Sequence, residues 1–118
     1  MTSKKILIVS DAGNKPYWDA SADEIREEIG PVTVVPDTQV STRAASHRSD
    51  VILIDISSIA DLHELIPRIH QEQPESRIIT VSSTPTWKQA REVLRLGAAN
   101  LIRKSSNLDE VISELRAL

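Results

Sequence analysis

Short apolar runs alternate with longer mixed segments along this chain. The runs lie at residues 6–9, 32–35, 51–57, 77–82 and 100–104. A short continuous apolar run that ends in small, polar or proline residues is typical of a strand buried on both faces of a parallel sheet. The pattern therefore predicts five buried strands.

Helical spacing marks most of the segments between these runs. Residues 21–29 are acidic and amphipathic, and Gly30 and Pro31 are expected to end that helix. A second helix is predicted to open at Asp61, where Pro67 either kinks it or delays its start. Its apolar face consists of Leu62, Leu65, Ile66 and Ile69.

Two further helices are predicted in the last third of the chain. Thr84 and Pro85 are expected to cap and begin a helix that runs over residues 86–96. Asn107 is expected to cap the last helix. Its apolar face consists of Leu108, Val111, Ile112 and Leu115. Residues 38–48 have the weakest pattern and suggest a short helix.

Five short strands that alternate with helices predict a three-layer α/β fold, with a parallel sheet between helices. For units of this length, a doubly wound, flavodoxin-like sheet of order 2-1-3-4-5 is expected. That order places the first and third strands side by side at the switch point, where such folds bind ligands. The whole chain, residues 1–118, is expected to form one domain.

Composition narrows the classes of function. The net charge of -3 is not the strongly basic balance that favours nucleic acid, so direct binding of nucleic acid is not expected. The absence of cysteine excludes disulfides and thiolate metal sites. The first apolar run is too short for a signal sequence or a membrane span, so a cytoplasmic location without membrane contact is expected. With few aromatic residues, the core is expected to consist of Ile, Val, Leu and Ala.

One carboxylate interrupts the most apolar strand. Asp55 follows Ile54 directly, and the apolar pattern resumes at Ile56. Because burying an unpaired carboxylate is costly, this residue is expected to have partners. Other polar residues fall at the carboxyl ends of this predicted strand and of three others, and so at the same edge of the sheet. They are Ser10, Asp11, Ser57, Ser82, Ser83 and Lys104.

These residues suit the transfer of a phosphoryl group to a carboxylate. Asp55 would be the nucleophile, and Asp11 would help to hold a hard divalent cation, Mg²⁺. Lys104 would bind one phosphoryl oxygen, and the Ser82 hydroxyl would donate a hydrogen bond to another. Each residue alone has an ordinary explanation: a structural aspartate, a turn-forming aspartate, a strand-end serine and an exposed lysine. Their joint placement favours the common site.

The chain resembles a response-regulator receiver domain, a CheY-like fold of two-component signal transduction, from about Lys4 to Leu118. The resemblance rests on Ile-Leu-Ile-Val-Ser-Asp in the first strand, Val-Ile-Leu-Ile-Asp in the third and Ile-Ile-Thr-Val-Ser-Ser in the fourth. It extends to Gly-Ala-Ala-Asn-Leu-Ile-Arg-Lys, which ends at Lys104. Single motifs of this length are weak evidence, but four at this spacing are strong.

The resemblance implies a role for each of these residues. Asp55 would accept a phosphoryl group from a histidine kinase or a phosphotransfer protein, with Ser82 as the switch hydroxyl and Lys104 as the phosphate-binding lysine. Asp11 would bind Mg²⁺ directly, together with Asp55 and the Ser57 backbone carbonyl. Ser10 would support the metal through water.

The resemblance also implies how such a domain signals. It would be a signalling domain and not an enzyme in the usual sense, with at most metal-assisted self-phosphorylation and slow self-dephosphorylation. Phosphorylation would change the face formed by the fourth strand, fourth helix and fifth strand, which controls an output domain or a partner protein. A homodimer through the fourth helix, fifth strand and fifth helix is a further possibility.

Three positions differ from the receiver pattern. Ser10 stands where a second acidic residue is usual, Leu101 where an aromatic switch residue is usual, and Ser105 where a proline usually follows the lysine. They keep open an alternative, a pseudo-receiver module that binds partners without being phosphorylated. A small nucleotide- or flavin-binding enzyme is a third class, but the first loop, with only Gly13, lacks a phosphate-binding glycine pattern.

Overall fold

The computed structural model describes residues 4–11, 13–36, 49–57, 62–104 and 108–117. These residues form a parallel sheet of five strands in the order β2-β1-β3-β4-β5, which confirms the predicted topology. The strands are β1 (Ile6–Ser10), β2 (Val32–Pro36), β3 (Val51–Asp55), β4 (Arg77–Ser82) and β5 (Asn100–Arg103).

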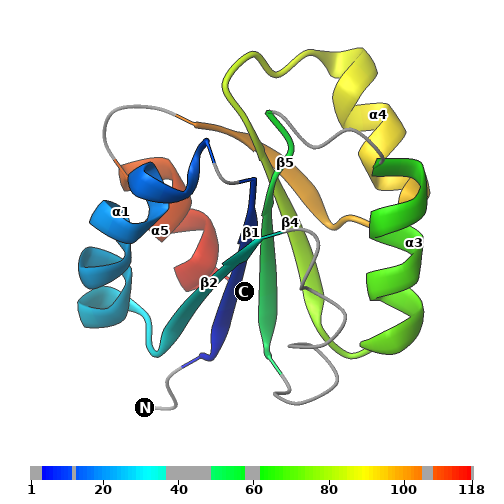
Figure 1. The fold of residues 1–118 in the computed structure, drawn as a ribbon. Coiled ribbons are helices and arrows are strands. Elements are labelled where there is room, and N and C mark those ends of the chain that lie inside the picture. The colour runs from blue at the N-terminus through cyan, green and yellow to red at the C-terminus, as the bar shows by residue number, and fades with distance from the viewer. Residues whose placement is uncertain (1–3, 12, 37–48, 58–61, 105–107, 118) are drawn as a thin grey trace.

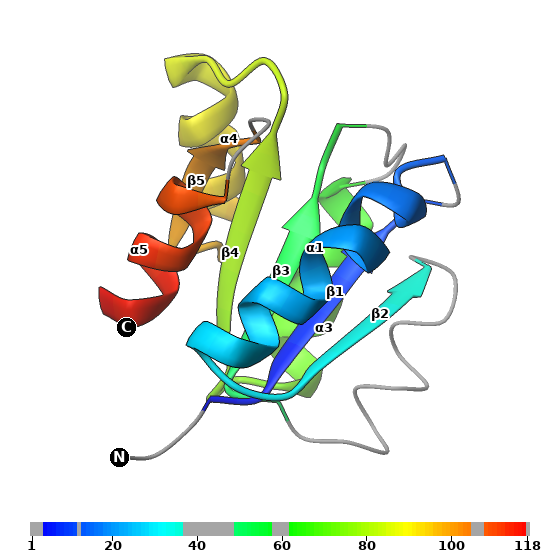
Figure 2. The ribbon, with the colours of Figure 1, turned by 90° about the vertical axis from the view of Figure 1, so that its left-hand side faces the viewer.

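Helices cover both faces of the sheet, as the three-layer prediction requires. Helices α1 (Lys15–Glu28) and α5 (Asp109–Ala117) lie on one face, and α3 (Leu62–Glu72) and α4 (Trp87–Leu96) lie on the other (Figure 1). Figure 2 views the molecule from the side of α1 and α5, with α1 crossing in front of β1 and β3.

Alternation along each strand divides the core in two. Ile6 and Ile8 of β1 belong to the cluster beneath α1 and α5, whereas Leu7 and Val9 belong to the cluster beneath α3 and α4. Successive side chains of a strand point to opposite faces, so a continuous apolar run supplies both clusters. The same four-residue run therefore fixes β1 between the two helical layers.

Helix α1 differs most from its predicted extent. It begins at Lys15 and not at residue 21, so residues 15–20, which precede the predicted helix, are also helical. Pro16 lies in its first turn, where the missing N–H costs nothing. Trp18, Ala22 and Ile25 form its buried face at helical spacing. The prediction of a purely aliphatic core is also wrong, because Trp18 is fully buried.

Smaller differences concern where elements begin and end. Strand β3 ends at Asp55, two residues before the predicted end. Helix α3 already runs from Leu62 through Pro67, so a late start is wrong. Helix α4 is capped by Thr86 and not by Thr84, since the Thr86 hydroxyl accepts a hydrogen bond from the Gln89 N–H at 3.1 Å.

Three predicted features lie outside the described residues. They are the helix over residues 38–48, the opening of a helix at Asp61 and the cap at Asn107. The apolar face predicted for the last helix is confirmed, because Leu108 and the three apolar positions after it are buried. Within the described ranges, no helix is both long and apolar enough to cross a membrane.

Candidate functional site

Asp55 ends the central strand of the sheet and is fully buried, with 0% of its side chain exposed. Strand β3 lies between β1 and β4, so the carboxylate sits at the switch point of the fold. A buried charge is tolerated where an opposite charge and hydrogen bonds compensate its lost hydration. Lys104 supplies the charge, with its Nζ 2.9 Å from the Asp55 Oδ2.

Three donors surround the Asp55 carboxylate. Oδ2 accepts hydrogen bonds from the Lys104 Nζ at 2.9 Å and from the Trp18 indole Nε1 at 2.8 Å. Oδ1 accepts one from the Ser57 backbone N–H at 3.0 Å. The carboxylate is therefore held in one orientation by groups from α1, from the turn after β3 and from the end of β5.

Lys104 has further contacts on the side of α1. Its Nζ donates a hydrogen bond to the Asn14 Oδ1 at 2.8 Å and lies 4.5 Å from the centre of the Tyr17 ring. A cation over an aromatic face is attracted by the ring's quadrupole. The Lys104 backbone N–H donates to the Ser82 carbonyl at 2.8 Å, which continues the pairing of β5 with β4. The ammonium is thus fixed between the first turn of α1 and Asp55.

Asp11 is joined to the Asp55–Lys104 pair through Asn14. The Asp11 Oδ1 accepts a hydrogen bond from the Asn14 Nδ2 at 2.5 Å, and its Oδ2 accepts one from the Gly13 N–H at 3.0 Å. A Cβ at Gly13 would lie 3.0 Å from that Oδ2, a tight contact that a small shift of the Asp11 side chain would have to relieve. The two carboxylates predicted for the site therefore share one hydrogen-bonded group.

The three predicted serines lie around this group. Ser10 is buried, and its hydroxyl donates to the Asp11 carbonyl at 3.0 Å. Ser82 is also buried, and its hydroxyl accepts from the Thr84 N–H at 3.2 Å. Ser57 is exposed, and its hydroxyl accepts from the Ser83 N–H at 3.3 Å. The predicted residues thus lie at one edge of the sheet, and two of them, Lys104 and Ser57, donate to Asp55 directly.

Sequence reasoning missed the contributions of α1 to the site. Tyr17 and Trp18 precede the helix that was predicted over residues 21–29, and no pattern in the sequence marks Asn14. The indole N–H of a buried tryptophan usually has a hydrogen-bond partner, and a buried aspartate needs one. That complementarity was the available signal, but pairing residues 18 and 55 required knowing that α1 begins at Lys15.

The pKa of Tyr17 depends on the charge at the site. Burial raises the pKa of its phenol above the ordinary value of 10.0, and the negative charge of Asp55 raises it further. Its ring also packs edge-on against Trp18, with 4.9 Å between the ring centres. Tyr17 is therefore a side chain whose ionisation reports the charge at Asp55.

The oxygen donors at this edge fit a hard divalent cation by type. Asp11 and Asp55 offer carboxylates and Ser57 a backbone carbonyl, and Mg²⁺ commonly takes one or two carboxylates and completes its shell with water. Within the described residues, no three His, Cys, Asp or Glu side chains gather closely enough to hold a metal ion. A cation at the Asp55 Oδ2 would compete with the two N–H donors there.

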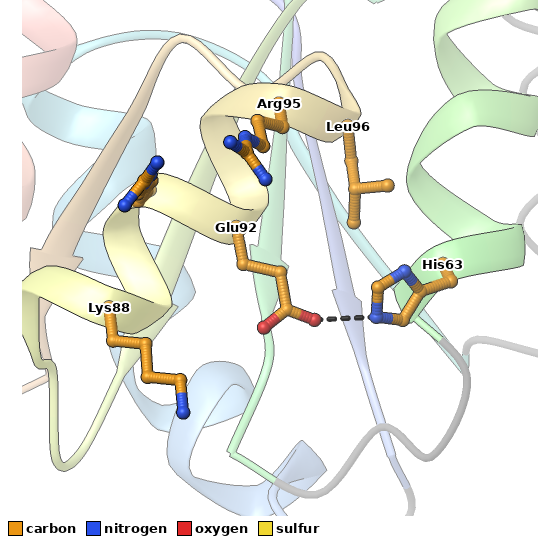
Figure 3. Close-up of a pocket in the computed structure, with 6 residues that line it drawn as sticks. His63, Lys88, Glu92, Arg95 and Leu96 are labelled. Carbon is orange, nitrogen blue, oxygen red and sulfur yellow. Dashed lines mark ion pairs between the residues drawn. The ribbon is translucent and has the colours of Figure 1, made fainter.

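A groove lies on the opposite side of the sheet, between α3 and α4 (Figure 3). Its volume is about 630 Å³. Its lining consists of His63, Lys88, Arg91, Glu92, Arg95 and Leu96. The His63 Nε2 lies 2.6 Å from the Glu92 Oε1, which bridges the two helices. The groove is open and basic, and it lies apart from Asp55.

The sequence matches no family model and no curated protein. Solved structures match closely in three dimensions. A response regulator from Thermotoga maritima has a TM-score of 0.86 and 16% identity, over 98% of this chain and 97% of that one. A CheY-like receiver domain protein from Methanospirillum hungatei JF-1 has a TM-score of 0.82 and 20% identity, over 98% of this chain and 93% of that one.

A response regulator from Burkholderia pseudomallei has a TM-score of 0.80 and 20% identity, over 98% of this chain and 72% of that one. That structure holds a phosphorylated aspartic acid, a calcium ion and citrate. TM-scores of 0.80 to 0.86, at identities of 16–20%, establish the fold alone. This chain has the fold of the response-regulator receiver domains.

Proposed function

We propose that this chain is a receiver domain that accepts a phosphoryl group on Asp55 from a histidine kinase or a phosphotransfer protein. The observation that supports this most is the buried Asp55–Lys104 pair at the carboxyl end of β3, with Nζ 2.9 Å from Oδ2. A lysine that already neutralises the acceptor is suited to hold an added phosphoryl oxygen. The fold shared with receiver domains supports the same reading.

The transfer itself needs one bond to form and one to break. An oxygen of Asp55 attacks phosphorus, the bond from phosphorus to the donor's imidazole nitrogen breaks, and that nitrogen keeps the electron pair. Lys104 would then bind a phosphoryl oxygen, and the Ser82 hydroxyl would donate to another. A divalent cation, which we expect to be Mg²⁺, would be held by Asp11, Asp55 and the Ser57 carbonyl, with Ser10 acting through water. It would supply positive charge against the phosphoryl oxygens.

The signal would leave through the face formed by β4, α4 and β5. Phosphorylation would shift an existing equilibrium between two conformations of this face. Trp87 and Leu94 of α4 are 75% and 48% exposed, and they would contact an output domain, a partner or a second copy of the chain. Leu101, at the position of the usual aromatic switch residue, is half-buried against the core. Because leucine has no aromatic ring, ring rotation is not part of this signal.

A pseudo-receiver that binds a partner without phosphorylation is the second candidate. It is favoured by one observation, the complete burial of Asp55 beneath three hydrogen-bond donors. In that case the Asp55–Lys104 pair would serve only to hold the ends of β3 and β5 against α1. The two candidates differ in whether Asp55 reacts at all.

Intact mass after incubation with acetyl phosphate and Mg²⁺ distinguishes them. The proposal predicts a gain of one phosphoryl group that is absent from Asp55→Asn and is removed by hydroxylamine, as an acyl phosphate should be. The matched control is Asp50→Asn, the same change at an exposed aspartate that bonds the Lys5 N–H at the other end of β3. An adduct that persists in Asp55→Asn, or no adduct on any of the three proteins, would reject phosphorylation at Asp55.

A further inference from the structure

The lone pairs of the Asp55 carboxylate are mostly in use. Each carboxylate oxygen offers about two in-plane sites for hydrogen bonds. Both sites of Oδ2 are taken, one by Lys104 and one by the Trp18 indole N–H. Oδ1 accepts from the Ser57 N–H, and no part of the side chain is exposed. An attacking lone pair at Oδ2 therefore becomes available only when one of its two donors leaves.

Trp18 is the donor whose departure opens the site. Lys104 has to stay, because it would hold the incoming phosphoryl group, and it keeps the Asn14 Oδ1 and the Tyr17 ring as further partners. The Trp18 side chain is fully buried over Asp55 and contributes its ring to the core beneath α1 and α5. Nothing in the proposed transfer uses its N–H.

One feature of the first turn of α1 favours release of this side chain. Asn14, the residue before the helix, makes no capping hydrogen bond with its side chain, because its amide bonds Asp11 and Lys104 instead. Helix ends that lack a cap open more readily than capped ones.

We propose that Oδ2 is the attacking oxygen and that Trp18 is a gate on it: the indole N–H must leave Oδ2 before phosphorylation, and the fraction of molecules in this opened state scales the rate. The inference rests on the proposed function. In the opened state, the Oδ2–phosphorus bond forms while the phosphorus–oxygen bond of acetyl phosphate breaks and acetate leaves with the electron pair. Trp18 thereby lowers the reactivity of Asp55 in the resting protein.

Removing the N–H tests the gate. Trp18→Phe is expected to acquire the phosphoryl group about tenfold faster than the unsubstituted protein, a factor that corresponds to the lower end of the range for a hydrogen bond to a charged group. Replacing Trp18 by benzothienylalanine keeps the bicyclic ring and removes only the donor, so it covers the case that Trp18→Phe fails to fold. Asp50→Asn, at an exposed position at the other end of β3, should leave the rate unchanged.

General loosening of the core has to be separated from loss of the gate. Ile25→Ala removes another fully buried side chain of α1 and leaves the Trp18 N–H in place. Acceleration in Ile25→Ala equal to that in Trp18→Phe would overturn the gate, as would equal rates in the Trp18 variants and the unsubstituted protein. Those results leave phosphorylation of Asp55 intact, whereas no adduct on any variant overturns both proposals.

Hydrogen exchange at the two indole groups gives an independent readout. Adding beryllofluoride, a mimic of the phosphoryl group, should strip the Trp18 N–H of its protection, while the exposed Trp87 N–H exchanges freely throughout. Binding of the mimic is followed separately by fluorine NMR. Full protection of the Trp18 N–H with beryllofluoride bound would overturn the gate.

Discussion

The two tryptophans of the chain stand at the starts of two helices and have opposite environments. Trp18, in the first turn of α1, is fully buried and donates to Asp55. Trp87, the first residue of α4, is 75% exposed. The start of α4 is held locally, by the cap from Thr86, whereas the start of α1 is held by the site itself. Where a local cap suffices, the neighbouring side chain remains available for a partner.

Replacing each tryptophan by alanine should give the largest difference between the two sites, in the free energy of unfolding. Trp18→Ala is expected to lower the free energy of unfolding by about 4 kcal/mol, because it empties a well-packed site in the core. Trp87→Ala should change it by less than about 0.5 kcal/mol, as is usual for exposed positions. Urea unfolding followed by circular dichroism measures both. Similar losses in the two variants would contradict the contrast.

The cap of α4 should have a moderate and purely local effect. Thr86→Ala removes the hydroxyl that accepts from Gln89 and is expected to cost about 1 kcal/mol. Thr86→Ser keeps a hydroxyl and serves as the control, with most of the stability retained. The same urea titrations report both values. A loss in Thr86→Ser as large as that in Thr86→Ala would show that the hydroxyl is not what holds this helix start.

The smallest expected effect is on the titration of Tyr17, the only tyrosine of the chain. Its pKa is raised in the folded protein by burial and then by Asp55. A raised pKa contributes stability that is complete below the unfolded value of about 10 and is lost as pH rises through the folded value. Ultraviolet absorbance of tyrosinate should therefore show a midpoint above that of unfolded protein.

Substitution of Asp55 should divide that shift into its two causes. Asp55→Asn removes the charge and leaves the burial, so the Tyr17 midpoint should fall part of the way toward the unfolded value. Asp50→Asn, at an exposed position at the other end of β3, should not move it. A midpoint that is the same in Asp55→Asn as in the unsubstituted protein would mean that Tyr17 does not sense the acceptor.

The order of the sheet was predictable from the sequence because buried parallel strands leave a strong local signal. Val51 to Ile54 can form little else than a buried strand, and Asp55 at its end marks the edge of the sheet. Lys104 could be assigned to the same edge because strands in one parallel sheet share their polarity. Periodicity and topology together were enough to bring these two residues to one edge of the sheet.

The contribution of α1 to the site could not be predicted from local sequence patterns. The start of α1 has no side-chain cap, and Lys15 to Trp18 resemble a loop when viewed without their tertiary contacts. Trp18 is helical because its ring fills the core and its N–H reaches Asp55, and both contacts join residues far apart in the chain. Contacts of that kind override local preferences and are absent from any window of the sequence.

The unused cap at Asn14 has a consequence for timing. A helix end that frays does so on the scale of helix–coil relaxation, on the order of 0.1–1 μs, far faster than most phosphoryl transfers. Opening of the first turn of α1 would then be a rapid pre-equilibrium, and the small open fraction would scale the observed rate. The Asn14 side-chain amide bonds Asp11 and Lys104 and does not cap its own helix. It would thereby set the fraction of time for which Asp55 is accessible to a phosphoryl donor.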